Sequence, residues 1–428
     1  MNPMVRELPV RIVEDPSRGF TTLPRRTMAA PDLVLALDVL GDDRLQLRMY
    51  GPAVPVIGTE HRVVVHRRPG EIRGVASRLR HLWKRELIDL QPLDARGRPA
   101  RSRAVLPYAT QLDLTGEPEH ELSGVLTELA DQGAHLLFRL LLASDGRGDV
   151  ERFRTVLLSV LAGPPLRIRV DSDLFLPWGM LALPARGMGG GGPSALFSRF
   201  LGHRHQIEQA GGHYIAAPDG LRPPPRIPVV SLNHDTTIDP AGRTRAADVA
   251  AALAKNTAFT ERTTRRELLR ALEDGTLNEQ LMYFWCHGSF RSDEGQTSCL
   301  VVRLTDGGEI DAYTVAARPA AGDEPEAFTP LVLLNACYAG LSGGADLAYL
   351  GRALIERGAR GVIGPQIEMP QVFAAEYALA FVTRYLEGDR TAGAIAHELA
   401  RHFADEYRNP LGFAYGLHGG MDERLERG

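Results

Sequence analysis

The chain has 428 residues, of which 44% are hydrophobic and 24% charged, and its formal net charge is −4. These values are ordinary for a globular protein of two or three domains, and they argue against the basic surface of a nucleic-acid-binding protein. Three cysteines, Cys286, Cys299 and Cys337, are too few for a disulfide framework and fit a reducing cytosol. The N-terminus lacks a charged-then-apolar signal pattern, and the longest leucine-rich run is too short to span a bilayer. We therefore expect a cytoplasmic protein.

The first half of the chain predicts a mixed α+β region in two parts. Residues 1–118 contain three short alternating runs typical of strands (LVLALDV, LQLRMY and HRVVVH) and a helix over 72–90, and we expect a sensing or docking role for them. Residues 119–221 begin with amphipathic helices over 119–143 and 150–161, followed by a strand at 166–170 and an apolar segment at 174–183. His203, His205 and His213 lie in a loop-like stretch without ligand spacing, so we expect solvated side chains there.

From residue 222 the pattern alternates strands and helices. A proline-rich spacer, RPPPRIP (222–228), marks the main domain boundary. Strands are expected at 227–232, 258–262, 281–286, 331–335 and 361–363, a small hairpin at 298–310, helices at 372–386 and 391–407, and a final extended segment at 411–417. Thr264 and Glu267 form a capping box at one helix start. Residues 222–428 are thus predicted to form an α/β domain with a mostly parallel sheet flanked by helices.

Two apolar strands of this domain each end on a reactive side chain. Residues 281–288, LMYFWCHG, end on His287 and Gly288, and residues 331–340, LVLLNACYAG, carry Cys337 just past the strand. The carboxyl ends of parallel strands form one sheet edge, where open α/β sheets place their ligands. A thiol attacks a peptide carbonyl as the thiolate, and an imidazole supplies the base. We therefore expect a His287–Cys337 dyad, with the backbone N–H groups of Gly288 and Cys337 as oxyanion donors.

The motifs HG after one strand and NAC-x-x-G after another resemble those of the caspase-like (clan CD) cysteine peptidases, and more specifically the bacterial CHAT domain. Further similarity lies in LRIRVDSDLFLPWGMLAL (166–183), YLGRALIERGARGVI (349–363) and NPLGFAYG (409–416), so the resemblance covers roughly residues 120–420. It implies a caspase-like fold and peptide-bond hydrolysis, with His287 as base, Cys337 as nucleophile and no metal or other cofactor. It also implies a protein or peptide substrate, a regulatory protein partner, no direct contact with nucleic acid or membrane, and a role in bacterial antiphage defence or cell death.

The sequence around Cys337 departs from the caspase pentapeptide QAC-[RQG]-G. Related peptidases that cleave after Arg or Lys have an acid two residues before the cysteine, where this chain has Asn335, so the P1 specificity stays open. CHAT domains often carry Trp and Asp after the next strand, where this chain has GPQIEM (364–369). Glu368 is a candidate replacement for that acid in a substrate pocket, with a simple surface charge as the alternative. Asn335 and Asp311 are further candidates for the pocket.

Two other functions stay open. Residues 340–344, GLSGG, match the G-x-S-x-G nucleophile elbow of α/β-hydrolases, with Asp389 and His402 or His418 downstream. Ser342 lies seven residues past Asn335, however, whereas an elbow serine belongs directly at the strand end. The other alternative is a caspase-like fold that serves as a non-catalytic interaction module.

Metal and nucleotide sites are disfavoured. A zinc site built from His287 and the three cysteines would need Cys286 and His287 on one side of a strand, but neighbouring strand residues face opposite ways, and no C-x-x-C spacing occurs. The glycine run at 187–192 fits G-x-G-x-x-G but lacks the accompanying acid of a dinucleotide site.

Overall fold

The computed structural model describes residues 29–55, 61–92, 98, 106–143, 146, 148–172, 174–185, 192–211, 224–274, 277–291, 299–317, 328–339 and 350–428. Residues Pro31–Gly428 form one compact unit, and it contains every helix and strand of these ranges. Among the described residues, no helix combines the length and the apolar character that crossing a bilayer requires.

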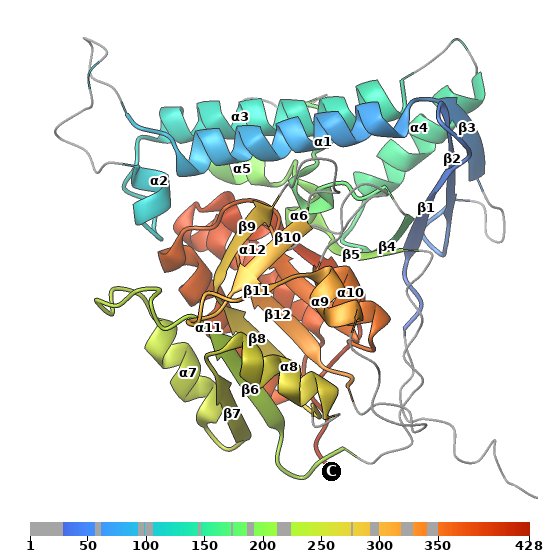
Figure 1. Cartoon of the computed structure of the whole chain (residues 1–428). Coiled ribbons are helices and arrows are strands. Elements are labelled where there is room, and N and C mark those ends of the chain that lie inside the picture. Colours follow the sequence, from blue (N-terminus) through green and yellow to red (C-terminus); the bar gives the residue numbers. More distant parts are fainter. Residues whose placement is uncertain are drawn as a thin grey trace, which may run out of the picture. The chain divides into compact units, whose positions relative to one another are not determined.

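A mixed sheet of eleven strands runs through this unit (Figure 1). In sheet order its strands are β3 (His61–His66), β2 (Arg44–Tyr50), β1 (Leu33–Val39), β4 (Arg167–Ser172), β5 (Gln206–Ala210), β14 (Tyr415–His418), β13 (Gly361–Pro365), β12 (Leu331–Asn335), β8 (Leu281–Trp285), β6 (Val229–His234) and β7 (Ala258–Arg262). Most neighbours run parallel, and the antiparallel pairs are β1–β2, β2–β3 and β13–β14. The predicted mostly parallel α/β fold is therefore confirmed, and the strands expected in the first half of the chain join the same sheet.

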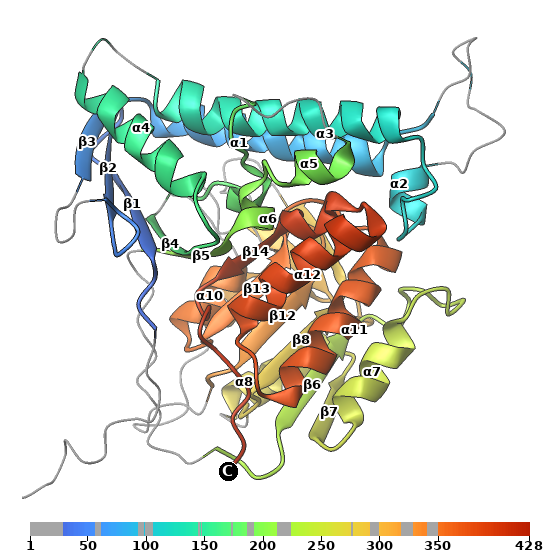
Figure 2. The same ribbon diagram turned by 180° about the vertical axis from the view of Figure 1, so that it is seen from behind.

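Helices cover both faces of the part of the sheet that runs from β13 to β7 (Figures 1 and 2). One face carries α8 (Arg265–Glu273), α9 (Ala312–Ala316) and α10 (Leu350–Glu356), and the other carries α7 (Ala246–Ala254), α11 (Gln371–Glu387) and α12 (Ala392–Tyr407). Met282 and Phe284 of β8 pack in the core on the side of α8, α9 and α10. Leu281, Tyr283 and Trp285 pack in the core on the side of α7, α11 and α12. A strand covered on both faces needs apolar residues at every position, which explains the unbroken run LMYFW.

The N-terminal helices include a long pair, α1 and α3, that lies side by side across one end of the sheet (Figures 1 and 2). They are α1 (Pro69–Trp83), which continues into a π-helical turn (Lys84–Ile88), α2 (Pro107–Thr110), α3 (Glu119–Ala134), which continues into a π-helical turn (His135–Leu141), and α4 (Gly148–Leu161). Trp83 at the end of α1 is fully buried and packs edge-on against Phe200 and Phe413, at ring-centroid distances of 5.5 and 6.5 Å. This aromatic cluster ties α1 to segments from the rest of the unit.

A second, three-stranded sheet holds the predicted hairpin. Its order is β11 (Glu309–Ile310), β10 (Cys299–Arg303) and β9 (His287–Arg291), and all its pairs are antiparallel. The capping box is also confirmed, because the Thr264 side chain accepts a hydrogen bond from the Glu267 backbone N–H and the Glu267 side chain accepts one from Thr264.

Several details of the sequence-based prediction are wrong. His205 is not solvated: it is 1% exposed, follows the short helix α6 (Leu201–Arg204), and hydrogen-bonds the backbone of Leu161 and Leu166. Strand β5 and helix α5 (Pro193–Phe197) were not expected. The segment 411–417 is extended only in its second half, because Pro410–Ala414 forms a 3₁₀ helix. His213 lies outside the described residues.

Candidate active site

The two candidate catalytic residues follow neighbouring parallel strands. β8 and β12 pair in a register that places Leu331 beside Leu281 and Asn335 beside Trp285. The contact continues past the strands, where the Cys286 N–H donates to the Asn335 carbonyl at 3.4 Å. His287 and Cys337 each follow two residues after this last register pair, at the carboxyl edge where α/β sheets bind ligands.

Gly288 brings the two main chains into direct contact. A Cβ atom at this position would lie 2.3 Å from the Cys337 carbonyl oxygen and 3.0 Å from its nitrogen. Both atoms belong to backbone that cannot rotate away, so only glycine fits here. The backbone N–H groups of Gly288 and Cys337, the two expected oxyanion donors, therefore belong to segments in van der Waals contact.

The environment of the Cys337 thiol combines burial with opposing charges. Burial raises the pKa of this thiol, hydrogen bonding from the Met369 backbone lowers it, the Glu368 carboxylate raises it, and the Lys84 ammonium lowers it, with a net rise. The imidazole of His287 is exposed, and no hydrogen bond within the described ranges joins it to the Cys337 sulfur.

Asn335 lies in the interior, 5% exposed, and both ends of its amide have partners. Its Nδ2 donates to the Ala374 carbonyl at 2.8 Å, and its Oδ1 accepts a hydrogen bond from the Tyr415 hydroxyl at 2.7 Å. A carboxylate could not donate to that carbonyl, which gives a structural reason for a neutral amide two residues before Cys337. The amide fixes the end of β12 from which the nucleophile emerges.

Tyr338, directly after Cys337, has a φ of 62°, which is uncommon for a bulky residue. Three contacts hold it there: its N–H donates to the Ile367 carbonyl at 3.2 Å, its hydroxyl donates to Glu368 Oε1 at 3.2 Å, and its ring lies 5.1 Å from that of Phe290. Glu368 thus lies beside the candidate nucleophile. Phe290 is 44% exposed and belongs to the strand that begins at His287, so an aromatic pair flanks the candidate dyad.

Asp311 serves as the N-cap of α9. Its Oδ1 accepts hydrogen bonds from the Thr314 N–H and hydroxyl, at 2.7 and 2.6 Å, and its Oδ2 lies 3.8 Å from Arg291 Nη2. In the same small sheet Arg303 pairs with His287 across β9 and β10 and with Glu309 across β10 and β11. This brings an arginine next to the candidate base, although the sequence pattern did not single it out.

Residues of the alternative sites fall in several places. Ser342 and the glycines around it lie outside the described residues, as do residues 187–191 of the glycine run. His418 is on β14 and His402 is on α12. Cys286 is buried, and burial raises the pKa of its thiol. In the ranges that the structure describes, no three His, Cys, Asp or Glu side chains are grouped so that they could hold a metal ion.

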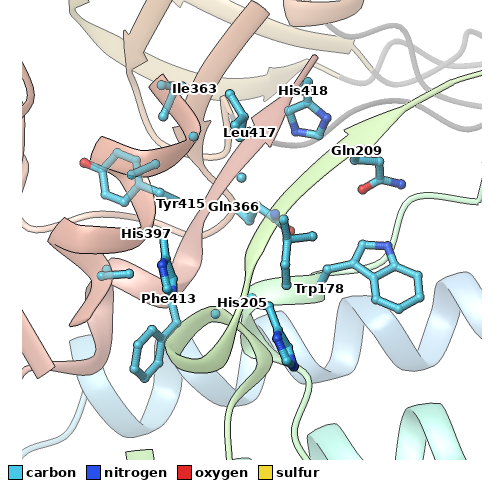
Figure 3. A pocket seen from close by; sticks show the side chains of 18 of the residues that line it. Trp178, His205, Gln209, Ile363, Gln366, His397, Phe413, Tyr415, Leu417 and His418 are labelled. Carbon is cyan, nitrogen blue, oxygen red and sulfur yellow. The ribbon is translucent and has the colours of Figure 1, made fainter. Parts of the chain in front are cut away.

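A separate cavity lies where the two halves of the large sheet meet. β5 and β14 share a single register pair, Gln209 with His418. Trp178, Gln209 and His397 are among the residues that line the cavity beside this join (Figure 3). Neither His287 nor Cys337 contributes to it.

The chain is an α/β protein with an open, mostly parallel sheet. An imidazole and a thiol follow two adjacent strands of this sheet. The family model of the CHAT domain matches residues 158–409, more than half of the chain. The chain therefore belongs to the CHAT domain family, as the sequence motifs predicted, and it has the caspase-like, peptidase-related character of that family.

Among solved structures, two crystal structures of the Saccharomyces cerevisiae separase–securin complex are similar to this chain. Their TM-scores are 0.46 and 0.43, each at 10% identity over 90% of this chain. The chain spans about 30% of the length of the matched chains. No curated protein matches it in sequence.

Proposed function

We propose that the chain is a cysteine endopeptidase with His287 and Cys337 as its catalytic dyad. The observation that carries the proposal is the parallel register of β8 and β12, together with the contact of Gly288 on the Cys337 backbone. A buried structural cysteine needs neither feature. Membership of the CHAT domain family supports the same chemistry.

In the proposed mechanism, His287 takes the thiol proton and the Cys337 thiolate attacks the peptide carbonyl. The backbone N–H groups of Gly288 and Cys337 stabilise the oxyanion of the tetrahedral intermediate. The imidazolium then returns its proton to the departing amine, which leaves a thioacyl-enzyme. Water, deprotonated by the same imidazole, hydrolyses the thioester and restores the thiol. No metal or cofactor takes part in these steps.

A peptide-library digest tests the activity and reads its specificity. We expect the wild-type chain to cleave a subset of peptides and Cys337→Ala to cleave none. Ser342→Ala is the matched control and keeps full cleavage. Cleavage that survives Cys337→Ala but is lost in Ser342→Ala would instead establish the serine hydrolase. The preferred P1 residue would show whether Glu368 or Asp311 contributes to a substrate pocket.

A non-catalytic interaction module is the second candidate. The raised pKa of the Cys337 thiol favours it, and so does the exposed His287 imidazole, which makes no hydrogen bond to that thiol among the described residues, because an inert cysteine needs no thiolate. If both the digest and labelling by a thiol-reactive peptide probe fail with the folded wild-type chain, this candidate replaces the peptidase.

The family resemblance also supports a proposal about the role of the protein in the cell. We infer a cytosolic protein, consistent with only three cysteines and no disulfide among them, whose proteolysis of a specific protein is controlled by a partner in antiphage defence or cell death. Residues 1–118 are the proposed sensing or docking part, 119–221 the supporting part and 222–428 the catalytic domain. Phage challenge of cells that carry the wild-type or the Cys337→Ala chain tests the role: equal plating efficiency in the two strains would contradict it.

A further inference from the structure

A chain of polar contacts links the N-terminal helices to the candidate nucleophile. Lys84 begins the π-helical turn that extends α1. Its Nζ lies 2.7 Å from Asp89 Oδ2 and 3.3 Å from Glu368 Oε2. The other oxygen of Glu368 accepts the hydrogen bond from Tyr338, the residue after Cys337. Single-turn π-helices are frequent at functional sites, and this one carries one of the only two lysines in the sequence.

We infer that Lys84 is a positioning residue for the nucleophile: its ion pair holds Glu368 against the Cys337–Tyr338 turn and connects residues 1–118 with the catalytic edge. This inference rests on the proposed function, because it gives Lys84 a role in preparing Cys337 to react.

A second contact from α1 reaches the same loop. Arg80, one helical turn before Lys84, donates from Nη2 to Gln366 Oε1 at 3.4 Å and to the Phe175 carbonyl at 3.3 Å. Residues four apart share a helix face, so the end of α1 and the π-helical turn that follows it present two basic side chains to residues 366–368. The buried Trp83 anchors the helix between them. The position of Lys84 is therefore set by packing and not by the ion pair alone.

The charges explain why the ion pair matters to the thiol. The Glu368 carboxylate raises the pKa of Cys337, and the Lys84 ammonium lowers it. Without Lys84, no ammonium group would offset the Glu368 carboxylate, which opposes formation of the Cys337 thiolate. The titratable groups around the thiol, from all elements packed near it, are Lys84, Asp89, Cys286, His287, Tyr338, Glu368 and Tyr415. Of these, Lys84 is the basic group contributed by residues 1–118.

Solvent exposure limits the size of the effect. The side chain of Lys84 is 22% exposed, and that of Glu368 is 44% exposed. Exposed ion pairs contribute little because water screens them. We therefore expect loss of the lysine charge to slow thiolate reactions of Cys337 by about threefold at a pH below the thiol pKa.

The test measures how fast iodoacetamide alkylates Cys337 in the full chain from pH 6 to 10, with the modified peptide quantified by mass spectrometry. Cys286 and Cys299 are 4% and 3% exposed, so they serve as internal references for the alkylation of buried thiols. The variants are Lys84→Met, Lys84→Arg, Glu368→Gln and the double variant Lys84→Met/Glu368→Gln. Lys255→Met, which removes the only other lysine, is the matched control.

We expect Lys84→Met to react about threefold more slowly than wild type at pH 7.5, and its rate profile to move to higher pH. Lys84→Arg and Lys255→Met should match wild type, and Glu368→Gln should react faster. The double variant should regain at least the wild-type rate, because the carboxylate that Lys84 balances is gone.

Equal rates in Lys84→Met and wild type would overturn the inference, and so would a slow double variant, which would indicate a structural defect. If Lys84→Met does not fold, the comparison of Glu368→Gln with wild type still tests the inference. An unchanged rate of Cys337 alkylation in Glu368→Gln would contradict the role of the carboxylate. Alkylation requires only the thiol. A failed peptide digest with the expected alkylation pattern would therefore overturn the peptidase and leave the role of Lys84 intact.

Discussion

Replacing Gly288 with alanine perturbs the contact between the two halves of the candidate dyad. The new Cβ would lie 2.3 Å from the Cys337 carbonyl oxygen, whereas ordinary contacts begin at 3.4 Å, so the two backbones must separate by about 1 Å. Misplacement of reacting groups by about 1 Å costs on the order of 100-fold in rate, and loss of one oxyanion donor costs a similar factor. We therefore expect kcat/KM to fall about 100-fold, which is about 2.7 kcal/mol of transition-state stabilisation.

The same substitution should lower the free energy of unfolding by about 1–3 kcal/mol, because overpacking forces the backbone to shift. Gly124→Ala in α3 is the matched control, since a Cβ there has no atom within 4 Å. Alanine in an exposed helix position should raise the unfolding free energy by about 0.5–1 kcal/mol. Its kcat/KM should stay at the wild-type value.

The assay combines hydrolysis of the best peptide from the library digest with urea unfolding followed by circular dichroism. The decisive comparison is between activity and stability in Gly288→Ala. A folded variant with wild-type kcat/KM would refute the assignment of this contact to the catalytic site. A loss of activity matched by complete unfolding would be resolved by the rate at a lower temperature, where the folded fraction recovers.

Three further changes test the surroundings of the site and the core. Asn335→Ala should lower the unfolding free energy by about 2 kcal/mol in urea titrations, because the Ala374 carbonyl and the Tyr415 hydroxyl lose their partner. Thr264→Ala removes the capping box and should cost about 1 kcal/mol in the same assay. Burial lowers the pKa of His205 from 6.5 to about 4, so the folded state binds fewer protons than the unfolded state between these values. Stability is complete above pH 6.5 and should fall by about 2 kcal/mol by pH 5. His205→Gln should flatten the dependence of the unfolding free energy on pH. An unchanged slope in this variant would contradict the assignment of the dependence to His205.

The C-terminal half of the fold could be predicted from the sequence because local signals and burial agree there. LMYFW and LVLLN are unbroken apolar runs, as expected for strands covered on both faces. The capping box at Thr264 predicted a helix start that the structure confirms. Because the segments that begin with these two strands lead to His287 and Cys337, the sequence indicated that both residues lie at one edge of the sheet. That the strands are neighbours is a long-range property, and it became visible only in the register of β8 and β12.

Other parts gave no usable local signal. QIEQA reads as polar loop, yet it forms β5, because pairing with β4 and burial of Glu208 and Gln209 stabilise it. His205 looked solvated because sequence does not show that two backbone groups would satisfy its ring nitrogens in the interior. Lys84 is separated by 284 positions from Glu368, so no spacing rule connects them. Its rarity in an arginine-rich chain was the only signal available.

The central claim is that Cys337 is a nucleophile activated by His287. The most direct measurement is the second-order rate constant for labelling by a peptide-based thiol-reactive probe, with the modified residue identified by mass spectrometry. The account predicts an adduct on Cys337 in the wild-type chain, and labelling of His287→Ala that is at least 100-fold slower while its circular dichroism spectrum is unchanged. Labelling of His287→Ala at the wild-type rate, or collapse of its fold, would contradict the dyad.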